Sequence, residues 1–246
     1  MAEKTVVIGL GEVGGPLCDL IAQTGADVLG VDVAPVEMPA PGTVGVVHVC
    51  IPFEVEDFVG ETARYIDRLR PELTVINSTV GIGTTRAVHE RTGGRVVHSP
   101  VRGKHARMLE ELTYYDKFIG PIDADAGALA KQHFESLGMT TKVLSSPEAS
   151  ELAKLTETTY FGVLIAWAQE VERYCEAVGV GYDEVVAIYE QVGYLPGVKF
   201  SPGVIGGHCV MPNIEILKTI GVAPLLEAVR TSNALTIARE ASRASA

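Results

Sequence analysis

The stretch that decides the fold is TVVIGLGEVG at residues 5–14, where an apolar β-type run leads directly into the spacing G-x-G-x-x-G. Glycines at these positions let the chain turn tightly after a strand and let the backbone approach a phosphate closely. The helical pattern that follows turns its positive N-terminal end toward the same phosphate. Because 26 glycines produce such a spacing by chance, the alternative is a turn that serves only the fold. The residues expected to contact a dinucleotide here are Gly9, Gly11, Glu12, Val13 and Gly14.

Asp32 favours the dinucleotide. It ends the second β-type run, about 20 residues beyond the glycine motif, where an acidic residue accepts hydrogen bonds from the adenosine ribose. A carboxylate at that place also repels the 2′-phosphate of NADP. The strand, the glycine motif, the helical pattern and Asp32 together predict a Rossmann site whose cofactor is NAD.

Alternating β-type and helical patterns continue to residue 145. They predict an α/β fold, a Rossmann-like, doubly wound parallel sheet covered by helices, as the NAD-binding domain at residues 1–145. The β-type runs are Thr5–Gly9, Asp27–Asp32, Val44–Ile51, Leu73–Asn77, Arg95–His98 and Lys142–Leu144. Such sheets bind ligands at the carboxyl ends of their strands, so Pro52, Ser78 and Thr79 are further candidate contacts. For Ser78 and Thr79 the alternative is a cap on the next helix.

The sequence changes character near residue 146. Ser146-Pro147-Glu148 is a good helix start, and apolar residues then recur at helical spacing to about Val178. Such a helix is roughly 45 Å long at 1.5 Å per residue. Two more helices are expected near Ile214–Thr219 and from Pro224 to about Ser242. Residues 146–246 are therefore predicted to form a mainly helical central domain with a long central helix.

The long helix also predicts a homodimer. Its apolar positions, which include Leu155, Val163 and Trp167, are more than one small domain covers. A second copy of the chain, related by twofold symmetry, would cover the remainder.

The composition limits the kinds of partner that the protein is expected to bind and the compartment in which it is expected. With 31 acidic and 20 basic residues the formal net charge is -11, which disfavours nucleic acid and anionic membrane surfaces. The longest apolar run, Phe161–Ala168, is too short to span a bilayer, and the chain begins without a signal-peptide pattern. The four cysteines are scattered, which indicates neither a metal site nor a disulfide framework. We therefore expect a soluble protein of the reducing cytoplasm, without a metal.

A basic cluster follows the fifth β-type run, where Ser99-Pro100 breaks the regular pattern. Its members are Arg102, Lys104, His105 and Arg107, in a chain that is acidic as a whole. Arginine forks and lysine charges suit phosphate and carboxylate groups, so the cluster is a candidate anion site. The alternative is a solvated basic loop.

Two reactive side chains lie in the second half of the chain. Cys209 follows paired glycines in GVIGGHC at residues 203–209, where His208 would bias the thiol toward the nucleophilic thiolate. The alternative is a buried, inert cysteine. Lys154 has apolar neighbours early in the long helix, which allows a semi-buried catalytic role, although most helix lysines are solvated.

Four motifs, in this order, resemble the UDP-glucose/GDP-mannose dehydrogenase family. They are the opening loop Gly9–Pro16, the strand end Ser78–Thr85, the central helix Glu151–Tyr160 and the loop Phe200–Cys209, which fits F-x-P-G-x-x-G-G-H-C. The resemblance covers essentially the whole chain and extends to the NAD-binding and central domains, without the C-terminal UDP-binding domain. It implies oxidation of a primary alcohol to a carboxylate in two NAD-dependent steps, through a thiohemiacetal and a thioester on a cysteine.

The resemblance also implies roles for individual residues. Cys209 is the nucleophile, Lys154 stabilises developing oxyanions, and Thr79 is a polar contact near the reacting carbon. The chain departs from the family at Thr158, which stands where an asparagine is usual, and at Asn213, which stands where an aspartate is usual.

A third departure is Val101, which stands where an acidic residue usually follows Ser-Pro. Neither valine nor asparagine acts as a general base, so thioester hydrolysis has lost its expected carboxylates, with His105 or Glu110 as substitutes. We therefore expect turnover to stop at one hydride. Without the UDP-binding domain, we expect a small anionic or sugar-like substrate, unless a separate partner supplies that surface. The residues expected to hold the substrate are Arg102, Lys104, His105, Thr158 and Asn213.

Two other functions stay open. A two-electron hydroxyacid-type dehydrogenase would use Lys154 and would not need Cys209. A non-redox, NAD-binding regulatory protein would account for the missing carboxylates.

Overall fold

The computed structural model describes residues 4–34, 36–103, 107–194, 200–207 and 209–244. The predicted site residues Lys104, His105 and His208 lie outside the described residues. The chain forms two compact units, unit 1 at Met1–Lys154 and unit 2 at Leu155–Ala246, which divide inside a helix. The domain boundary expected at residues 145 and 146 stays a prediction.

Unit 1 contains a twisted sheet with the strand order β2-β1-β3-β4-β5-β6-β7 in its described residues. The strands are β1 (Lys4–Ile8), β2 (Val28–Val31), β3 (Val44–Val49), β4 (Leu73–Ile76), β5 (Val96–His98), β6 (Lys117–Pro121) and β7 (Thr141–Val143). Neighbouring strands are parallel, except that β5 and β6 are antiparallel. The predicted α/β, Rossmann-like fold is confirmed. The strand order changes direction between β1 and β3, because β2 pairs with one side of β1 and β3 with the other.

Strand β6 corrects the prediction of a wholly parallel sheet. The run Lys117–Pro121 begins with a lysine and ends with Gly120 and Pro121. Because these residue types are uncommon in strands, the sequence pattern did not predict a strand here. Pairing of β6 with β5 is antiparallel through Val97 and Pro121. The segment between β5 and β6, which contains a helix, begins and ends at the same end of the sheet. Strand β6 therefore runs antiparallel to β5.

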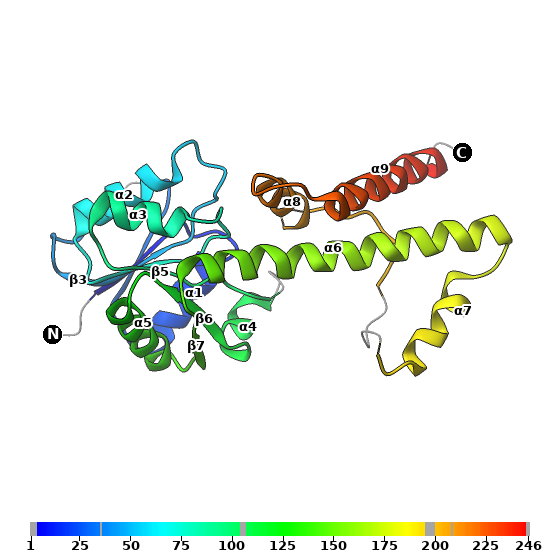
Figure 1. The fold of residues 1–246 in the computed structure, drawn as a ribbon. Helices are drawn as coiled ribbons and strands as arrows, with labels where there is room; N and C mark the ends of the chain where they lie inside the picture. The colour runs from blue at the N-terminus through cyan, green and yellow to red at the C-terminus, as the bar shows by residue number, and fades with distance from the viewer. Residues whose placement is uncertain (1–3, 35, 104–106, 195–199, 208, 245–246) are drawn as a thin grey trace. The chain divides into compact units, whose positions relative to one another are not determined.

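Helices cover both faces of the sheet and bury a separate apolar core on each (Figure 1). In β1, Val6 and Ile8 point to the core shared with α2 and α3, while Val7 points to the core shared with α1, α4 and α5. Because the strand is buried on both sides, it reads as a continuous apolar run in the sequence. The helices are α1 (Gly14–Gln23), α2 (Phe58–Leu69), α3 (Thr84–Thr92), α4 (Met108–Tyr114) and α5 (Ala124–Ser136).

The predicted long helix is α6, which runs from Pro147 to Val178 and has 32 residues. The part of α6 in unit 2 packs against the two predicted C-terminal helices, α8 (Val210–Lys218) and α9 (Pro224–Ala244). Their shared core includes Ala166 of α6, Ile214 of α8 and Val229 of α9. A short helix α7 (Tyr182–Val186) and a 3-10 helix (Ala187–Gln191) follow α6. Within the described part of the chain, no helix is both long and apolar enough for a membrane span.

Candidate functional site

The glycine motif forms a tight turn between β1 and α1. Gly9 has a φ of 84°, and its N–H donates to the Val31 carbonyl over 2.8 Å. A Cβ on Gly14 would lie 1.8 Å from the Gly9 carbonyl oxygen, so this position admits no side chain. A Cβ on Gly11 would meet no described atom within 4 Å. The turn is therefore closed at Gly14 and open at Gly11.

Asp32, at the end of β2, is bonded to this turn. Its carboxylate accepts hydrogen bonds from the N–H groups of Leu10 and Val33, each over 2.8 Å. These backbone hydrogen bonds lower the pKa of Asp32, so its exposed carboxylate is charged at neutral pH. Helix α1 leaves the turn after Val13, which gives it no side-chain cap in the described structure, and Glu12 is exposed beside it. A negative group and an uncapped helix end therefore flank the open turn.

Ser78 and Thr79 follow β4, at the edge of the sheet where β1 and β3 also end. The Ser78 hydroxyl donates to the Ile51 carbonyl over 2.6 Å, which ties the end of β4 to the segment after β3. Helix α3 begins only at Thr84, so the alternative that Ser78 or Thr79 caps it is wrong. Thr79 is half-buried and Pro52 is exposed. Their contact with a cofactor stays a prediction.

Lys117, which sequence reasoning missed, is buried beneath this edge. Its ammonium group donates to the Ser99 carbonyl over 2.7 Å, and to Asn77 Oδ1 and the Pro100 carbonyl over 3.3 Å each. Burial lowers the pKa of Lys117 to about 7. The Lys117 side chain thus joins the Asn77 side chain, after β4, to the backbone after β5.

His98 and Lys154 lie near the same edge. The ring of His98, at the end of β5, donates from Nε2 to the Ser78 carbonyl over 3.1 Å and accepts at Nδ1 from the Ser150 hydroxyl over 2.9 Å. Burial lowers the pKa of His98 to about 3, against the hydrogen bond to Ser78 and together with the charges of Lys117 and Lys154. Lys154 itself is half-buried on α6. Unit 1 therefore brings Lys154 and Ser78, predicted from separate motifs, to one end of the sheet.

Glu151 links α6 to helix α3 within unit 1. Its fully buried carboxylate accepts hydrogen bonds from the Gly83 N–H over 2.7 Å, the Thr85 N–H over 2.9 Å and the Thr85 hydroxyl over 2.6 Å. Burial raises the pKa of Glu151, although these hydrogen bonds oppose the shift. Gly83 has no side chain with which to cap α3, so Glu151 supplies the cap from a distant part of the sequence.

The described members of the basic cluster have partners within the protein. Arg102 donates to the Asp116 carbonyl over 2.8 Å, and its guanidinium lies 4.7 Å from the centre of the Phe118 ring. Arg107 forms an ion pair with Glu111 over 2.7 Å. The alternative of a fully solvated loop therefore does not describe Arg102, which is half-buried. An anion site at this cluster stays a prediction.

Cys209 differs from the other cysteines because it is exposed, so the alternative of a buried cysteine is wrong. It is the N-cap residue of α8 and follows the described segment 200–207, which contains neither helix nor strand. Burial raises the pKa of Cys18, and it raises the pKa of Cys50 to about 12. Cys175 is buried. The exposed thiol at Cys209 is therefore the best placed of the four to meet a reagent.

The three positions that depart from the family pattern differ in exposure. Val101 and Asn213 are buried, at 8% and 4% of their accessible surface. Thr158 is half-buried, and its hydroxyl donates to Glu157 over 3.3 Å. The substrate contacts expected of Thr158 and Asn213 stay predictions.

The chain is similar in sequence and fold to several dehydrogenases. It is 26% identical to UDP-N-acetyl-D-mannosamine dehydrogenase of Methanocaldococcus jannaschii over 85% of this chain and 60% of that protein. The solved UDP-D-ManNAc dehydrogenase of Pyrococcus horikoshii superposes with a TM-score of 0.83 over 97% of this chain and 70% of that one, at 21% identity. Mycobacterium tuberculosis 3-hydroxyisobutyrate dehydrogenase superposes with a TM-score of 0.72 over 96% of this chain and 94% of that one, at 20% identity.

The strand order and the glycine turn define the fold class, which is Rossmann-like. The central-domain model of the UDP-glucose/GDP-mannose dehydrogenase family matches residues 148–235 of the chain. The chain spans about three fifths of the length of the curated relatives that it matches first. The resemblance found in the sequence motifs is thereby confirmed.

Proposed function

We propose that the chain is an NAD-dependent dehydrogenase that oxidises a CH–OH group of a nucleotide-sugar or a related small anionic substrate. The observation that carries the proposal is the glycine turn, open at Gly11 and bonded to the charged Asp32. The substrate class comes from relatives named UDP-N-acetyl-D-mannosamine dehydrogenase and NDP-N-acetyl-D-galactosaminuronic acid dehydrogenase. We also propose a cytoplasmic location, which suits the free thiols of the four cysteines.

Asp32 is expected to make the protein prefer NAD. Its carboxylate is charged and exposed, so the 2′-phosphate of NADP would meet like charge. Titration calorimetry should give a Kd at least tenfold lower for NAD than for NADP, about 1.4 kcal/mol. Asp32→Ser should narrow that ratio, while Asp27→Ser, an exposed aspartate that pairs with Lys4, should keep it. Equal affinity of the natural chain for both dinucleotides would remove the role of Asp32.

The protein's own residues contribute to each stage of the proposed reaction. When bound, NAD accepts the hydride that leaves the carbinol carbon. Lys154 stabilises the oxygen as its proton leaves, and Thr79 contacts the reacting group. The Cys209 thiolate then adds to the aldehyde carbonyl to form a thiohemiacetal. The thiohemiacetal would become a thioester only by giving a second hydride to another bound NAD. Water must then attack that thioester to release a carboxylate, and neither Val101 nor Asn213 is a base that activates the water.

Because the thioester is not hydrolysed, we expect multiple turnover to release the aldehyde after one hydride, with a fraction of Cys209 held as a covalent adduct. With UDP-N-acetyl-D-mannosamine and NAD, NADH should form in one equivalent per substrate consumed, and the product should be an aldehyde. Peptide mass spectrometry should find the adduct on Cys209 in the natural chain and in Cys175→Ala, but not in Cys209→Ala. Two equivalents of NADH and a carboxylate product would show that another group replaces the lost base.

A second candidate is a two-electron hydroxyacid-type dehydrogenase. It is favoured by the fold match to 3-hydroxyisobutyrate dehydrogenase, which extends over 94% of that chain. This function needs Lys154 but no thiol. Full turnover of a small hydroxyacid by Cys209→Ala, with none by Lys154→Met, would select it over the first proposal.

We also propose a homodimer that forms through α6. Tyr160, Trp167 and Tyr174 recur every seventh residue and keep 56%, 53% and 57% of their surface exposed, which makes an apolar stripe on the helix. Light scattering at micromolar concentration should give twice the chain mass of 26.1 kDa. Trp167→Glu should shift the mass toward the monomer, and Tyr114→Glu, on α4, should not. A monomeric natural chain would contradict the proposal.

A further inference from the structure

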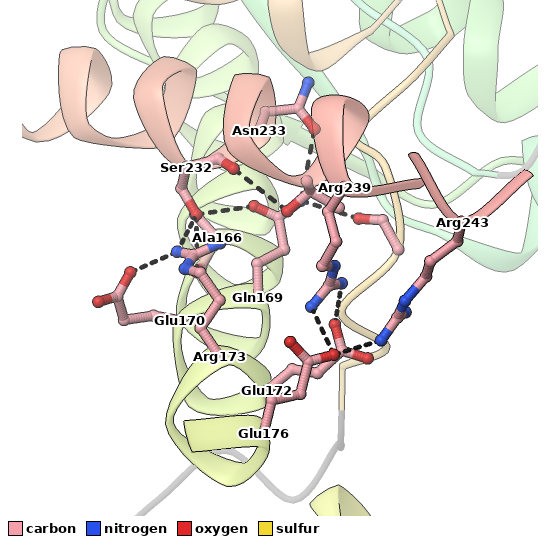
Figure 2. A network of polar contacts seen from close by, with 12 residues as sticks. Ala166, Gln169, Glu170, Glu172, Arg173, Glu176, Ser232, Asn233, Arg239 and Arg243 are labelled. Carbon is pink, nitrogen blue, oxygen red and sulfur yellow. Dashed lines mark hydrogen bonds and ion pairs between the residues drawn. The ribbon is translucent and has the colours of Figure 1, made fainter. Parts of the chain in front are cut away.

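The segment that leads to Cys209 takes its backbone hydrogen bonds from a side chain of α9. Residues 200–207 form neither helix nor strand, so their peptide groups have no ladder partners. Asn233 Oδ1 accepts from the Ile205 N–H over 2.8 Å, and Asn233 Nδ2 donates to the Ile205 carbonyl over 3.0 Å. Figure 2 shows Asn233 on α9, within the network of polar contacts that joins α9 to α6. The Asn233 amide thus pairs with Ile205 as a neighbouring strand would.

Gln169 of α6 holds the same segment two residues earlier. Its Nε2 donates to the Gly203 carbonyl over 2.8 Å, while its Oε1 accepts from the Ser232 hydroxyl over 2.9 Å (Figure 2). The bond from Ser232 fixes the orientation of the amide, so the Nε2 donor must face the loop. Gln169 is fully buried, and Asn233 is 3% exposed. Both amides are therefore committed to the loop rather than to solvent.

The other end of the loop is fixed by packing. Val210, which follows Cys209 and begins α8, is buried in the core between α6, α8 and α9. Gly162 of α6 makes room for it, because a Cβ at that position would lie 2.5 Å from Val210 Cγ1. The backbone is thus held at Ile205 and again at Val210, with Gly206 and Gly207 between them.

We propose that Asn233 and Gln169 are positioning residues for Cys209. Their amides hold Gly203 and Ile205 against α6 and α9, and this fixes where the exposed thiol emerges before α8. The inference rests on the proposed function for its use, because a nucleophile must be held in one geometry to add to a carbonyl. The contacts themselves lie wholly within unit 2 and are testable without turnover.

A matched control is present on the same pair of helices. Arg239 of α9 forms ion pairs with Glu172 and Glu176 of α6, further along both helices than Asn233 and Gln169 (Figure 2). Arg239→Met weakens the docking of α9 on α6 and removes no bond to the loop. Asn233→Leu removes both bonds to Ile205 at nearly constant volume.

The test is the alkylation rate of Cys209 by iodoacetamide at pH 7, followed by peptide mass spectrometry and compared with the rate in the urea-unfolded chain. In Asn233→Leu the rate should move at least threefold toward the unfolded value, and exchange of the Ile205 amide hydrogen should accelerate at least tenfold. Arg239→Met should leave both unchanged. Gln169→Met, which removes the hydrogen bond to the Gly203 carbonyl, should shift the alkylation rate less and in the same direction. This variant replaces Asn233→Leu in the test if Asn233→Leu does not fold.

Two results overturn the positioning role. One is that Asn233→Leu and Arg239→Met have the same effect on Cys209 alkylation, whether or not the rate changes. The other is a natural chain whose Cys209 reacts at the unfolded rate. Where the chain turns over a substrate, Asn233→Leu should lower kcat more than it changes KM, and this effect should vanish in a Cys209→Ala background. Failure of the proposed function appears separately, as a thiol that is positioned in the alkylation test but forms no substrate adduct.

Discussion

Replacement of Glu151 by glutamine is expected to lower the melting temperature by about 6–12 °C, because a buried N–H group loses its acceptor. Glu151 accepts from Gly83 with one oxygen and from Thr85 with the other. A glutamine amide offers one oxygen only, so its NH2 group must face a donor. When a charged acceptor is removed and its buried donor is left unpaired, the free energy of unfolding falls by about 3 kcal/mol. For a chain of this size the melting temperature falls by about 2–4 °C for each kcal/mol of lost stability, which gives the expected decrease.

Glu148 provides the control, since it lies one turn earlier on the same helix. It pairs with Arg86 over 2.6 Å, but both side chains are partly exposed, at 30% and 44%. An ion pair of this kind contributes about 0–1 kcal/mol, so Glu148→Gln should lower the melting temperature by less than about 4 °C. Thermal unfolding followed by circular dichroism at pH 7 measures both variants. Equal shifts for the two glutamates would contradict the capping role of Glu151.

Glu151 also illustrates what the sequence could not predict. Its place on a helix followed from apolar spacing, which depends on neighbours within a few residues. Its partners, Gly83 and Thr85, belong to a different motif, and only the tertiary fold brings them together. The same holds for Lys117, whose strand lacked the β-type pattern and whose partners come from other strands.

The features predicted from sequence are those in which the local chain determines the geometry. The position of the glycine turn follows from steric limits on the backbone, and the position of Asp32 follows from the place where the second parallel strand ends. Both lie where the sequence predicted them. The long helix followed from its periodicity. The exposure of Cys209 could be anticipated only as one of two alternatives, because it depends on tertiary packing and not on the residues next to it in the sequence.

Gly14→Ala is expected to weaken NAD binding at least 100-fold, about 2.7 kcal/mol. The added Cβ would lie 1.8 Å from the Gly9 carbonyl oxygen, and neither atom can move unless the backbone of the turn moves. The turn must therefore open, which moves the end of β1 and the start of α1 apart. Overpacking of this kind also costs about 1–3 kcal/mol of stability, so the melting temperature should fall as well.

Gly11→Ala separates the cofactor role of the turn from its structural role. A Cβ at Gly11 meets no described atom within 4 Å, and the residue has no positive φ, so the fold should tolerate the methyl group. If the pyrophosphate approaches the backbone at Gly11, the same methyl group blocks it, and the Kd for NAD should rise about tenfold with the melting temperature unchanged. Gly193→Ala, at another position where a Cβ would meet no described atom within 4 Å, should change neither quantity. Calorimetry and thermal unfolding on the three variants decide the matter. Unchanged NAD affinity in Gly11→Ala would mean that the open side of the turn faces no phosphate, and the dinucleotide would have to be sought elsewhere on the sheet edge.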